Sequence, residues 1–374
     1  MKLDIITSAL PPKFDAIGHY TALFSKELVS HAESRILVPE GMDYEPIDGV
    51  TILPCFSTQS PEGIRGLIEP IAARQPDWVL LEFNPFMYGR RGYAPQLIPT
   101  LKEIKRRSPK TRLAAMIHER FAWGEFKLKV MATWQIPMFL QLGSLVDQIF
   151  ISTSTWTRQF AVLFPRKPVQ HLPVGSTIPH VGLSRDEARA RLQIPESVVV
   201  VGVFGTAHVS RMLHLVREVL QASQAEGRDA RLLYIGPNGE TMRQVLGDLE
   251  PISTEGPLPF EEISRRFMAM DLYLAPFSDG ISTRRTSLMA SLQHGIASVG
   301  TRTRWTDAVL TEAHERAILL APAQDEATFV AEALRLVRDP ALRERIGKNA
   351  QALYEAELTP AIGAQRFLAA LNKA

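Results

Sequence analysis

The stretch SDGISTRRTSLMASLQHGIASVGT, residues 278–301, contains a turn, a helix and the start of a strand in one short run. It follows the apolar run MDLYLAPF, and its Asp-Gly pair is typical of a turn. The residues TSLMASLQH predict a helix with Thr286 or Ser287 as its N-cap and with Gly295 just after its end. A strand that turns directly into a helix is typical of open α/β sheets, which bind ligands at the carboxyl ends of their strands.

Two arginines, Arg284 and Arg285, stand directly before this predicted helix. The N-terminus of a helix carries a partial positive charge, so cations are unfavourable there unless an anion offsets them. One interpretation is therefore a turn that binds an anion. The alternative is that both arginines point to solvent, where their position costs only about a few tenths of a kcal/mol.

Short apolar runs alternate with helical patterns along most of the chain. The predicted strands lie at 2–10, 35–38, 51–54, 78–83, 112–117, 148–152, 169–172, 198–204, 231–235, 270–276, 296–300 and 317–320. Such alternation predicts an α/β protein with parallel sheets that are covered by helices on both faces. After residue 321 the sequence is almost wholly helical, with breaks at the Asp-Pro pair 339–340 and the Thr-Pro pair 359–360.

The Pro- and Gly-rich run LPVGSTIP, residues 172–179, separates two series of strands and helices. We place the first domain at residues 1–175 and begin the second at residue 176. Both are predicted to be doubly wound, Rossmann-like domains. Two such domains facing a central cleft would line it with strand carboxyl ends and helix N-termini, which suits an anionic or nucleotide ligand.

Composition excludes several classes of protein. The net charge of +2 and the pI near 8.6 do not indicate a nucleic-acid partner. The densest basic run, 105–110, is typical of a solvated helix end, with a membrane-surface patch as the alternative. The single cysteine, Cys55, excludes an internal disulfide and favours a reducing compartment. The apolar stretch 136–146 is far below the about 20 residues that a spanning helix needs. We therefore expect a cytoplasmic protein, with peripheral contact at the inner membrane face as an open alternative.

Several common motifs are absent from the sequence. No G-x-G-x-x-G follows the first strand, which argues against a dinucleotide-dependent dehydrogenase. No G-x-x-x-x-G-K-[ST] occurs, which argues against P-loop phosphoryl transfer. No H-E-x-x-H occurs, and the nine histidines show no metal-ligand spacing. The sequence therefore predicts no metal site.

Four positions at predicted strand ends are candidates for a ligand site. Gly18 is expected at the start of the first helix, where glycine lets the backbone approach a phosphate; a simple loop glycine is the alternative. His118 ends the strand RLAAMIH; hydrogen bonding to a neighbouring loop is its structural alternative. Arg211 is expected in the first turn of a helix, with His208 in the same turn, where a guanidinium can bind two phosphate oxygens; a solvated arginine is the alternative.

The order of these features resembles glycosyltransferase family 4, a family of retaining enzymes with the GT-B architecture. The motifs are the glycine-bearing first loop, IHE, VGVFG followed by an arginine, YIGPNG, GPLPFEEISRRFMAMDLYLAPF and DGISTRRTSLMASLQHGIASVGT. The resemblance covers essentially the whole chain and is most specific over residues 256–301.

The resemblance implies a nucleotide-sugar donor held by the domain at 176–355 and an acceptor bound by the domain at 1–175. It implies that a last helix, at 356–374, crosses back onto the N-terminal domain. Basic side chains and a helix N-terminus neutralise the diphosphate leaving group in this family, so no metal or other cofactor is expected. By position, Gly18 matches the glycine at the donor phosphate, His118 the histidine beside the transferred sugar, and Arg211 the lysine that binds the diphosphate.

Three positions depart from the family pattern. Thr206 stands where the family usually has an arginine, and Ser282 and Ala290 stand where it has paired glutamates. A carboxylate for the donor's ribose is therefore missing. We infer that the arginines at 284–285 supply the positive charge that Thr206 lacks.

These inferences define three groups of candidate residues. The predicted catalytic residues are His118, Arg211, Arg284 and Arg285. The predicted donor-binding residues are Gly18, Thr206, His208, Asp279, Gly280, Ser282, Thr286 and Ser287. The predicted acceptor-binding residues are Asp15, Glu82, Asn84 and Glu119.

The sequence thus predicts a retaining glycosyltransferase that moves a sugar from a UDP- or GDP-linked donor to a hydroxyl or amine acceptor. The loop EFNPFMYGRRGY mixes aromatic, amide and basic groups, which suits a saccharide, a glycolipid or a small natural product as acceptor. Two alternatives remain: a nucleotide-sugar hydrolase or epimerase of the same fold, and a non-catalytic nucleotide-sugar-binding partner protein. No particular oligomeric state is predicted.

Overall fold

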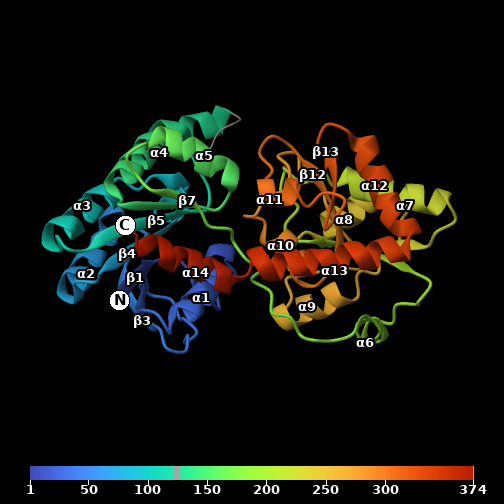
Figure 1. The fold of residues 1–374 in the computed structure, drawn as a ribbon, viewed down its shortest axis with the longest axis horizontal. Coiled ribbons are helices and arrows are strands. Elements are labelled where there is room, and N and C mark those ends of the chain that lie inside the picture. The colour runs from blue at the N-terminus through green and yellow to red at the C-terminus, as the bar shows by residue number, and fades with distance from the viewer. Residues whose placement is uncertain (122–125, 374) are drawn as a thin grey trace. The chain divides into compact units, whose positions relative to one another are not determined.

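The computed structural model describes residues 1–121 and 126–373 (Figure 1). The chain divides into two compact units. Unit 1 is Met1–Pro173 together with Pro360–Ala374, and unit 2 is Val174–Thr359. The divisions fall between residues 173 and 174 and between 359 and 360, whereas the sequence analysis placed them after 175 and after 355.

Unit 1 is built on a seven-stranded parallel sheet in the order β3-β2-β1-β4-β5-β6-β7. Its strands are β1 (Lys2–Ile6), β2 (Glu33–Pro39), β3 (Thr51–Phe56), β4 (Trp78–Phe83), β5 (Arg112–Ile117), β6 (Gln148–Ile151) and β7 (Val169–His171). Its helices are α1 (Ala16–Leu28), η1 (Pro61–Leu67), α2 (Ile68–Arg74), η2 (Arg90–Gly92), α3 (Leu97–Arg107), α4 (Phe126–Leu145), α5 (Ser154–Leu163) and α14 (Pro360–Leu371).

The last helix, α14, belongs to unit 1 although it follows unit 2 in the chain (Figure 1). Its Phe367 is fully buried, and the ring centroid lies 5.2 Å from that of Phe24 in α1 and 4.9 Å from that of Phe150 in β6. Burial of these aromatic rings attaches the helix to the first sheet. The expected return of the C-terminal helix to the N-terminal domain is confirmed.

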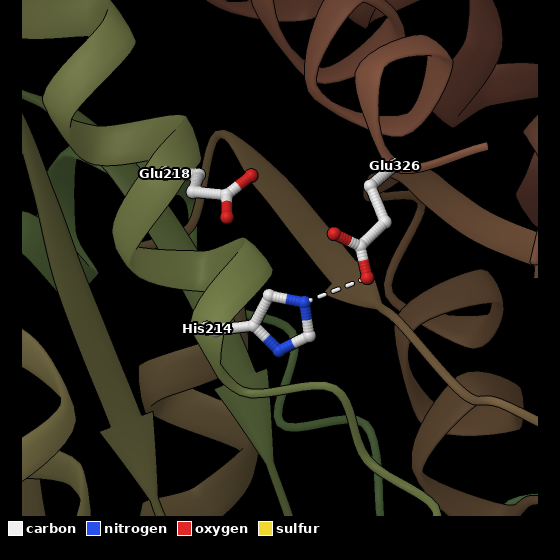
Figure 2. A group of neighbouring side chains, drawn as sticks. All are labelled: His214, Glu218 and Glu326. Atoms are coloured by element: carbon white, nitrogen blue, oxygen red, sulfur yellow. Dashed lines mark hydrogen bonds and ion pairs between the residues drawn. The ribbon is translucent and has the colours of Figure 1, made fainter. Parts of the chain in front are cut away.

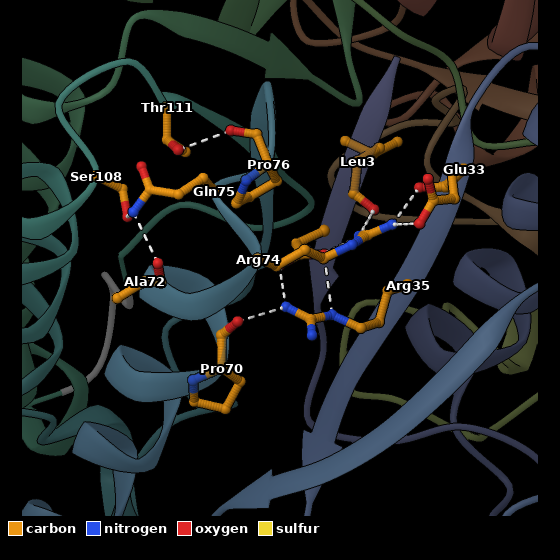
Figure 3. Close-up of polar contacts among 11 residues, drawn as sticks. Leu3, Glu33, Arg35, Pro70, Ala72, Arg74, Gln75, Pro76, Ser108 and Thr111 are labelled. Carbon is orange, nitrogen blue, oxygen red and sulfur yellow. Dashed lines mark hydrogen bonds and ion pairs between the residues drawn. The ribbon is translucent and has the colours of Figure 1, made fainter.

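Unit 1 also contains a buried cluster of ionic groups (Figure 3). Asp4 in β1 is fully buried and accepts hydrogen bonds from Arg35 Nη2 at 2.6 Å and Nε at 3.1 Å, and from Arg74. Arg74 also donates to Glu33 Oε1 at 2.9 Å, and Arg35 donates to the carbonyl of Pro70 at 2.9 Å. Each arginine therefore has both a carboxylate and a carbonyl acceptor within the fold.

Unit 2 is built on a six-stranded parallel sheet in the order β10-β9-β8-β11-β12-β13. Its strands are β8 (Val199–Phe204), β9 (Ala230–Ile235), β10 (Ser253–Glu255), β11 (Leu272–Ala275), β12 (Ala297–Arg302) and β13 (Leu319–Pro322). Its helices are α6 (Arg185–Arg191), α7 (His214–Ala225), α8 (Gly239–Leu246), α9 (Phe260–Met268), α10 (Thr286–Gln293), α11 (Ala308–Thr311), α12 (Glu326–Arg338) and α13 (Pro340–Glu357).

The two parallel sheets confirm the predicted α/β class with two Rossmann-like domains. Each of the twelve predicted strands overlaps an observed one, and the breaks near 339 and 359 separate α12, α13 and α14. The edge strand β10 was not predicted, because its three residues, Ser253–Glu255, include no aliphatic side chain. Edge strands of this kind carry little periodic signal.

Two local predictions about helix starts were wrong. Helix α7 begins at His214, so Arg211 precedes the helix instead of lying in its first turn; its backbone forms an isolated β-bridge with Phe277. The N-cap of α10 is Arg285, without a side-chain capping bond, in place of Thr286 or Ser287.

Within the described residues, none of the helices combines the length and the apolar character that crossing a membrane would require.

Candidate functional site

Arginines from two loops of unit 2 meet at the ring of Phe277. The guanidinium carbon of Arg211 lies 4.5 Å from the ring centroid, and that of Arg285 lies 3.8 Å from it. The backbone N–H of Ser278 donates to the carbonyl of Ser210 at 2.7 Å, which joins the loop after β8 to the loop after β11. Because β8 and β11 are neighbouring parallel strands, residues about seventy positions apart meet at the carboxyl edge of the sheet.

Asp279 provides a carboxylate that both members of the arginine pair contact. It accepts from Arg284 Nη2 at 3.0 Å and from Arg285 Nη2 at 2.6 Å. Asp279, which the sequence analysis placed among the donor-binding residues, thus offsets part of the charge at the start of α10. Together with Arg211, whose guanidinium packs on the same ring, the arginine pair brings three guanidinium groups to one edge of the sheet.

Arg211 is the most buried of the three arginines. It is 7% exposed, and its Nη2 donates to the carbonyl of Phe204 at 2.9 Å. Its Nε and Nη1 find no hydrogen-bond acceptor among the residues that the structure describes. A buried donor without an acceptor is costly, typically by about 1–3 kcal/mol and more when charged. Two guanidinium nitrogens, Nε and Nη1, therefore carry N–H bonds that could be donated to an anion.

The start of α10 contributes backbone donors to the same place. Arg285 gives no side-chain cap, and among the described residues no acceptor reaches the backbone N–H of Thr286 or Ser287. The first N–H groups of a helix are the usual donors to bound phosphate. The predicted donor-binding residues Thr286 and Ser287 therefore lie beside the arginines.

The loop that leads into α10 is tightly held. The carbonyl of Asp279 accepts from Thr303 Oγ1 at 2.8 Å, and Asp307 accepts from the Thr283 backbone N–H at 2.6 Å. Gly280 has a φ of 80°, and a Cβ there would lie 2.7 Å from Thr306 Oγ1, so a larger residue does not fit. Ser282, a predicted donor-binding residue, is buried, and its Oγ has no hydrogen-bond partner in the described part of the chain.

The loop after β8 brings two further donor candidates close to Arg211. Thr206 and His208 are exposed, and His208 Nδ1 lies 2.9 Å from Ser210 Oγ. The side-chain oxygen of Asn238 accepts from the backbone N–H of Ala207 at 2.9 Å. Sequence reasoning missed this role for Asn238, because the run GPNG is explained by turn chemistry alone.

In unit 1, His118 and Glu82 form a buried pair. Glu82, in β4, is fully buried, and His118, just after β5, is 8% exposed. His118 Nε2 lies 2.5 Å from Glu82 Oε2, and the edge of the Tyr20 ring packs on the imidazole with centroids 5.3 Å apart. Glu82, expected to bind an acceptor, is therefore turned to His118 and has no exposed surface.

The remaining unit 1 candidates are Gly18, in the first turn of α1, and three residues on loops that follow strands of the sheet. Asp15 is the N-cap of α1 and accepts from the backbone N–H of Gly18 at 2.7 Å. A Cβ at Gly18 would lie 2.7 Å from the carbonyl oxygen of Ala9, so glycine is required by close packing against the loop after β1. Asn84, half-buried, accepts from the N–H of Phe86 at 3.0 Å, and Glu119 is half-buried.

One group of side chains in the described residues has the composition of a metal site (Figure 2). His214 and Glu218 lie on α7 and Glu326 begins α12, with their ligand atoms within 4.8 Å of one another. All three are exposed, and His214 Nε2 lies 2.8 Å from Glu326 Oε1. A surface contact between the two helices accounts for this geometry.

Comparison with known proteins agrees with this architecture. Residues 195–339 match the family described as Glycosyl transferases group 1. A search of curated proteins gave no match. The chain superimposes on sucrose-phosphate synthase from Thermosynechococcus elongatus with a TM-score of 0.73 and 12% identity, covering 100% of this chain and 98% of that one.

Two further structures show the same fold. A glycosyltransferase from Rickettsia africae gives a TM-score of 0.69 at 10% identity, covering 100% of this chain and 98% of that one. HepE of Anabaena, in complex with UDP and glucose, gives 0.65 at 11% identity, with 100% of both chains covered. The chain therefore has the GT-B fold. The family match within unit 2, together with this fold, supports a glycosyltransferase.

Proposed function

We propose that the protein transfers a sugar from a nucleoside-diphosphate donor and that the arginine group of unit 2 binds the diphosphate. The observation that carries this proposal is the buried guanidinium of Arg211. Its Nε and Nη1 have no hydrogen-bond acceptor among the described residues. Arg285 and the open N–H groups at the start of α10 lie on the same loops. A diphosphate supplies several anionic oxygens to such a set of donors.

The proposed reaction retains configuration. The bond between the sugar's anomeric carbon and the diphosphate oxygen breaks, and the bond to the acceptor oxygen forms on the same face. The acceptor's proton passes to the departing diphosphate oxygen, so little acid–base equipment is required from the protein. The main contribution of the arginines is to stabilise the charge that develops on the diphosphate, and removing one such donor typically costs about 10²–10³ in rate.

We further propose that the reaction needs no metal ion. The guanidinium groups of Arg211, Arg284 and Arg285 would stabilise the charge that a divalent cation stabilises on other diphosphates. Turnover should then survive a chelator. Activity that is abolished by EDTA and restored by Mn²⁺ would contradict this part of the proposal.

For the acceptor, the loop between β4 and α3 of unit 1 offers exposed aromatic and basic side chains. Phe86 is 46% and Tyr93 is 55% exposed, and Arg90 and Arg91 are also exposed. The Arg91 carbonyl accepts from Trp134 Nε1 and Gln135 Nε2, each at 3.2 Å, which fixes the loop. Exposed rings beside hydrogen-bond donors suit a saccharide acceptor.

A thermal-shift screen against nucleoside diphosphates tests the donor site first. A specific ligand present at 100 times its dissociation constant should add about 2.7 kcal/mol to the free energy of unfolding. The donor with the matching nucleotide is then incubated with and without candidate acceptors. Product that forms only with an acceptor supports transfer, whereas equal turnover without one indicates a hydrolase or epimerase. Binding without any turnover indicates a partner protein, and no stabilisation by any diphosphate would overturn the donor site.

A further inference from the structure

The pair formed by Glu82 and His118 is held by the sheet itself. Strands β4 and β5 pair in parallel, with Glu82 opposite Met116. The backbone N–H of His118 then donates to the carbonyl of Phe83 at 2.9 Å. Both side chains therefore leave neighbouring strands at the same edge, and their contact does not depend on a mobile loop.

The contact defines where the imidazole carries its proton. An ionised Glu82 has only acceptor oxygens, so with this carboxylate the 2.5 Å contact between Glu82 Oε2 and His118 Nε2 places N–H on Nε2. A neutral imidazole with its proton on Nε2 keeps a lone pair on Nδ1. Among the described residues, His118 Nδ1 has no hydrogen-bond partner.

The surroundings leave Glu82 no competing cation within the described residues. Its second oxygen, Oε1, is buried without a hydrogen-bond partner there. Burial, and next the charge of Glu82, raise the pKa of Tyr20 well above its ordinary value, and the same two causes raise the pKa of Tyr88. Both phenols therefore stay neutral. The imidazole of His118 is the group that contacts the Glu82 carboxylate.

We propose that Glu82 is a positioning residue that holds His118 as the Nε2–H tautomer, so that Nδ1 is left to accept a hydrogen bond from a hydroxyl of the transferred sugar. This inference rests on the proposed function and on the family resemblance, which implies that His118 lies beside that sugar. Glu82 acts only through His118, because its own oxygens are buried. An aspartate that orients a catalytic histidine in hydrolases uses the same chemistry.

The tautomer can be measured without any activity. In ¹⁵N-labelled protein, long-range ¹H–¹⁵N spectra distinguish a protonated from a bare imidazole nitrogen, and His118→Asn identifies the His118 signals by their loss. We expect Nε2 protonated and Nδ1 bare in the wild type, and a mixture of tautomers in Glu82→Gln. A wild-type signal with the proton on Nδ1 would overturn the proposal, whether or not the variant folds.

A double-mutant cycle tests the link to turnover. We expect Glu82→Gln to lower kcat for release of nucleoside diphosphate by about 10²-fold, the lower end of what a positioned proton-transfer or hydrogen-bonding group supplies. In the His118→Asn background the same change should have almost no further effect. Independent, multiplicative losses would show that Glu82 does not act through His118. Glu69→Gln, on the exposed surface of unit 1, is the matched control and should leave turnover unchanged.

Nucleoside-diphosphate affinity separates this inference from the proposed function. All four proteins should bind the diphosphate as the wild type does, because the arginine group is in unit 2. One outcome is that the wild type binds and turns over the donor while the effects of Glu82→Gln and His118→Asn on kcat are independent. In that case only the proposed role of Glu82 is wrong. If the wild type binds no nucleoside diphosphate, the proposed function fails, and the role of Glu82 in sugar transfer fails with it.

Discussion

The two units contain arginine groups of opposite character. In unit 1, Arg35 and Arg74 are matched by Asp4 and Glu33, and backbone carbonyls accept their remaining contacts (Figure 3). In unit 2, Arg284 and Arg285 both contact the carboxylate of Asp279, and Arg211 keeps two buried nitrogens, Nε and Nη1, without an acceptor in the described chain. The arginines of the first group have acceptors within the fold, whereas Arg211 of the second group lacks acceptors for two of its nitrogens.

This difference distinguishes a structural role from a binding role. A balanced buried cluster stabilises the fold only as long as each partner remains, because the loss of one partner leaves an unpaired charge. A buried guanidinium whose donors have no acceptor, as in Arg211, is unfavourable until an anion binds it. Substitutions should therefore change stability in unit 1 and ligand affinity in unit 2.

The largest expected effect is on the stability of unit 1. Asp4→Asn should lower the free energy of unfolding by about 3–5 kcal/mol, because two arginines lose their buried carboxylate. Denaturant unfolding measures the loss, and nucleoside-diphosphate affinity should be unchanged in the folded variant. Glu69→Gln, which removes the exposed partner of Arg107, is the control and should leave the midpoint in place. An Asp4→Asn protein with the wild-type free energy of unfolding would show that the cluster does not stabilise the fold.

Acid should weaken unit 2 through His294, which follows the helix that begins at the arginine group. Burial lowers the pKa of His294 from its ordinary 6.5 to about 4. Between these values the unfolded chain binds a proton that the folded chain does not, so the free energy of unfolding falls as the pH drops from about 6.5 towards 4.

The shift corresponds to a loss of about 3 kcal/mol across that window. Denaturant unfolding at several pH values, for the wild type and for His294→Gln, measures this contribution. It is the difference between the two proteins in the slope of the free energy of unfolding against pH. Parallel pH profiles for the two proteins would mean that His294 becomes protonated in the fold without penalty.

The next effect is on ligand affinity. Arg211→Ala should weaken nucleoside-diphosphate binding by about tenfold or more, since a hydrogen bond to a charged group is worth about 1.5–3 kcal/mol. Binding of the bare nucleoside should change little. The free energy of unfolding should change less than ligand affinity, because the lost hydrogen bond to the Phe204 carbonyl is offset by the removal of two buried nitrogens that have no acceptor. Calorimetric titration of both ligands provides the measurement.

Arg284→Ala and Arg285→Ala are titrated with the same two ligands. We expect Arg285→Ala to lose more nucleoside-diphosphate affinity, because Arg285 packs on Phe277 beside Arg211. Arg231→Ala removes an arginine paired with Asp229 on the surface of unit 2 and is the control. If the preference for diphosphate over nucleoside survives in Arg211→Ala and in both pair variants, the arginine group does not bind the diphosphate.

The smallest effect concerns the carboxylate inside the arginine group. Asp279→Asn removes the internal anion, so nucleoside-diphosphate affinity should rise, by about threefold for an interaction of roughly 0.6 kcal/mol at a partly exposed site. Because Asp279 is half-exposed, stability should change little. A fall in affinity would mean that Asp279 mainly orients Arg284 and Arg285 and competes little with the ligand.

The sequence located most of the fold because its signals are local. Runs such as 78–83 and 112–117 are apolar over their full length, as strands buried on both faces must be, and both match the observed strands. The positions of Arg211, Arg284 and Arg285 after such strands were enough to place them at one sheet edge. The short polar strand β10 carried no such signal and was missed.

What the sequence by itself determined is therefore the alternation of strands and helices, the two parallel sheets, and the arginines at the end of one of them. Only the tertiary structure decided how those side chains are partnered. Asp279 binds the arginine pair, Arg211 is buried before α7 with open donors, and Glu82 meets His118 across two strands. Periodicity is set by neighbours within a few residues, whereas each of these contacts depends on which strands lie side by side and how the loops between them pack.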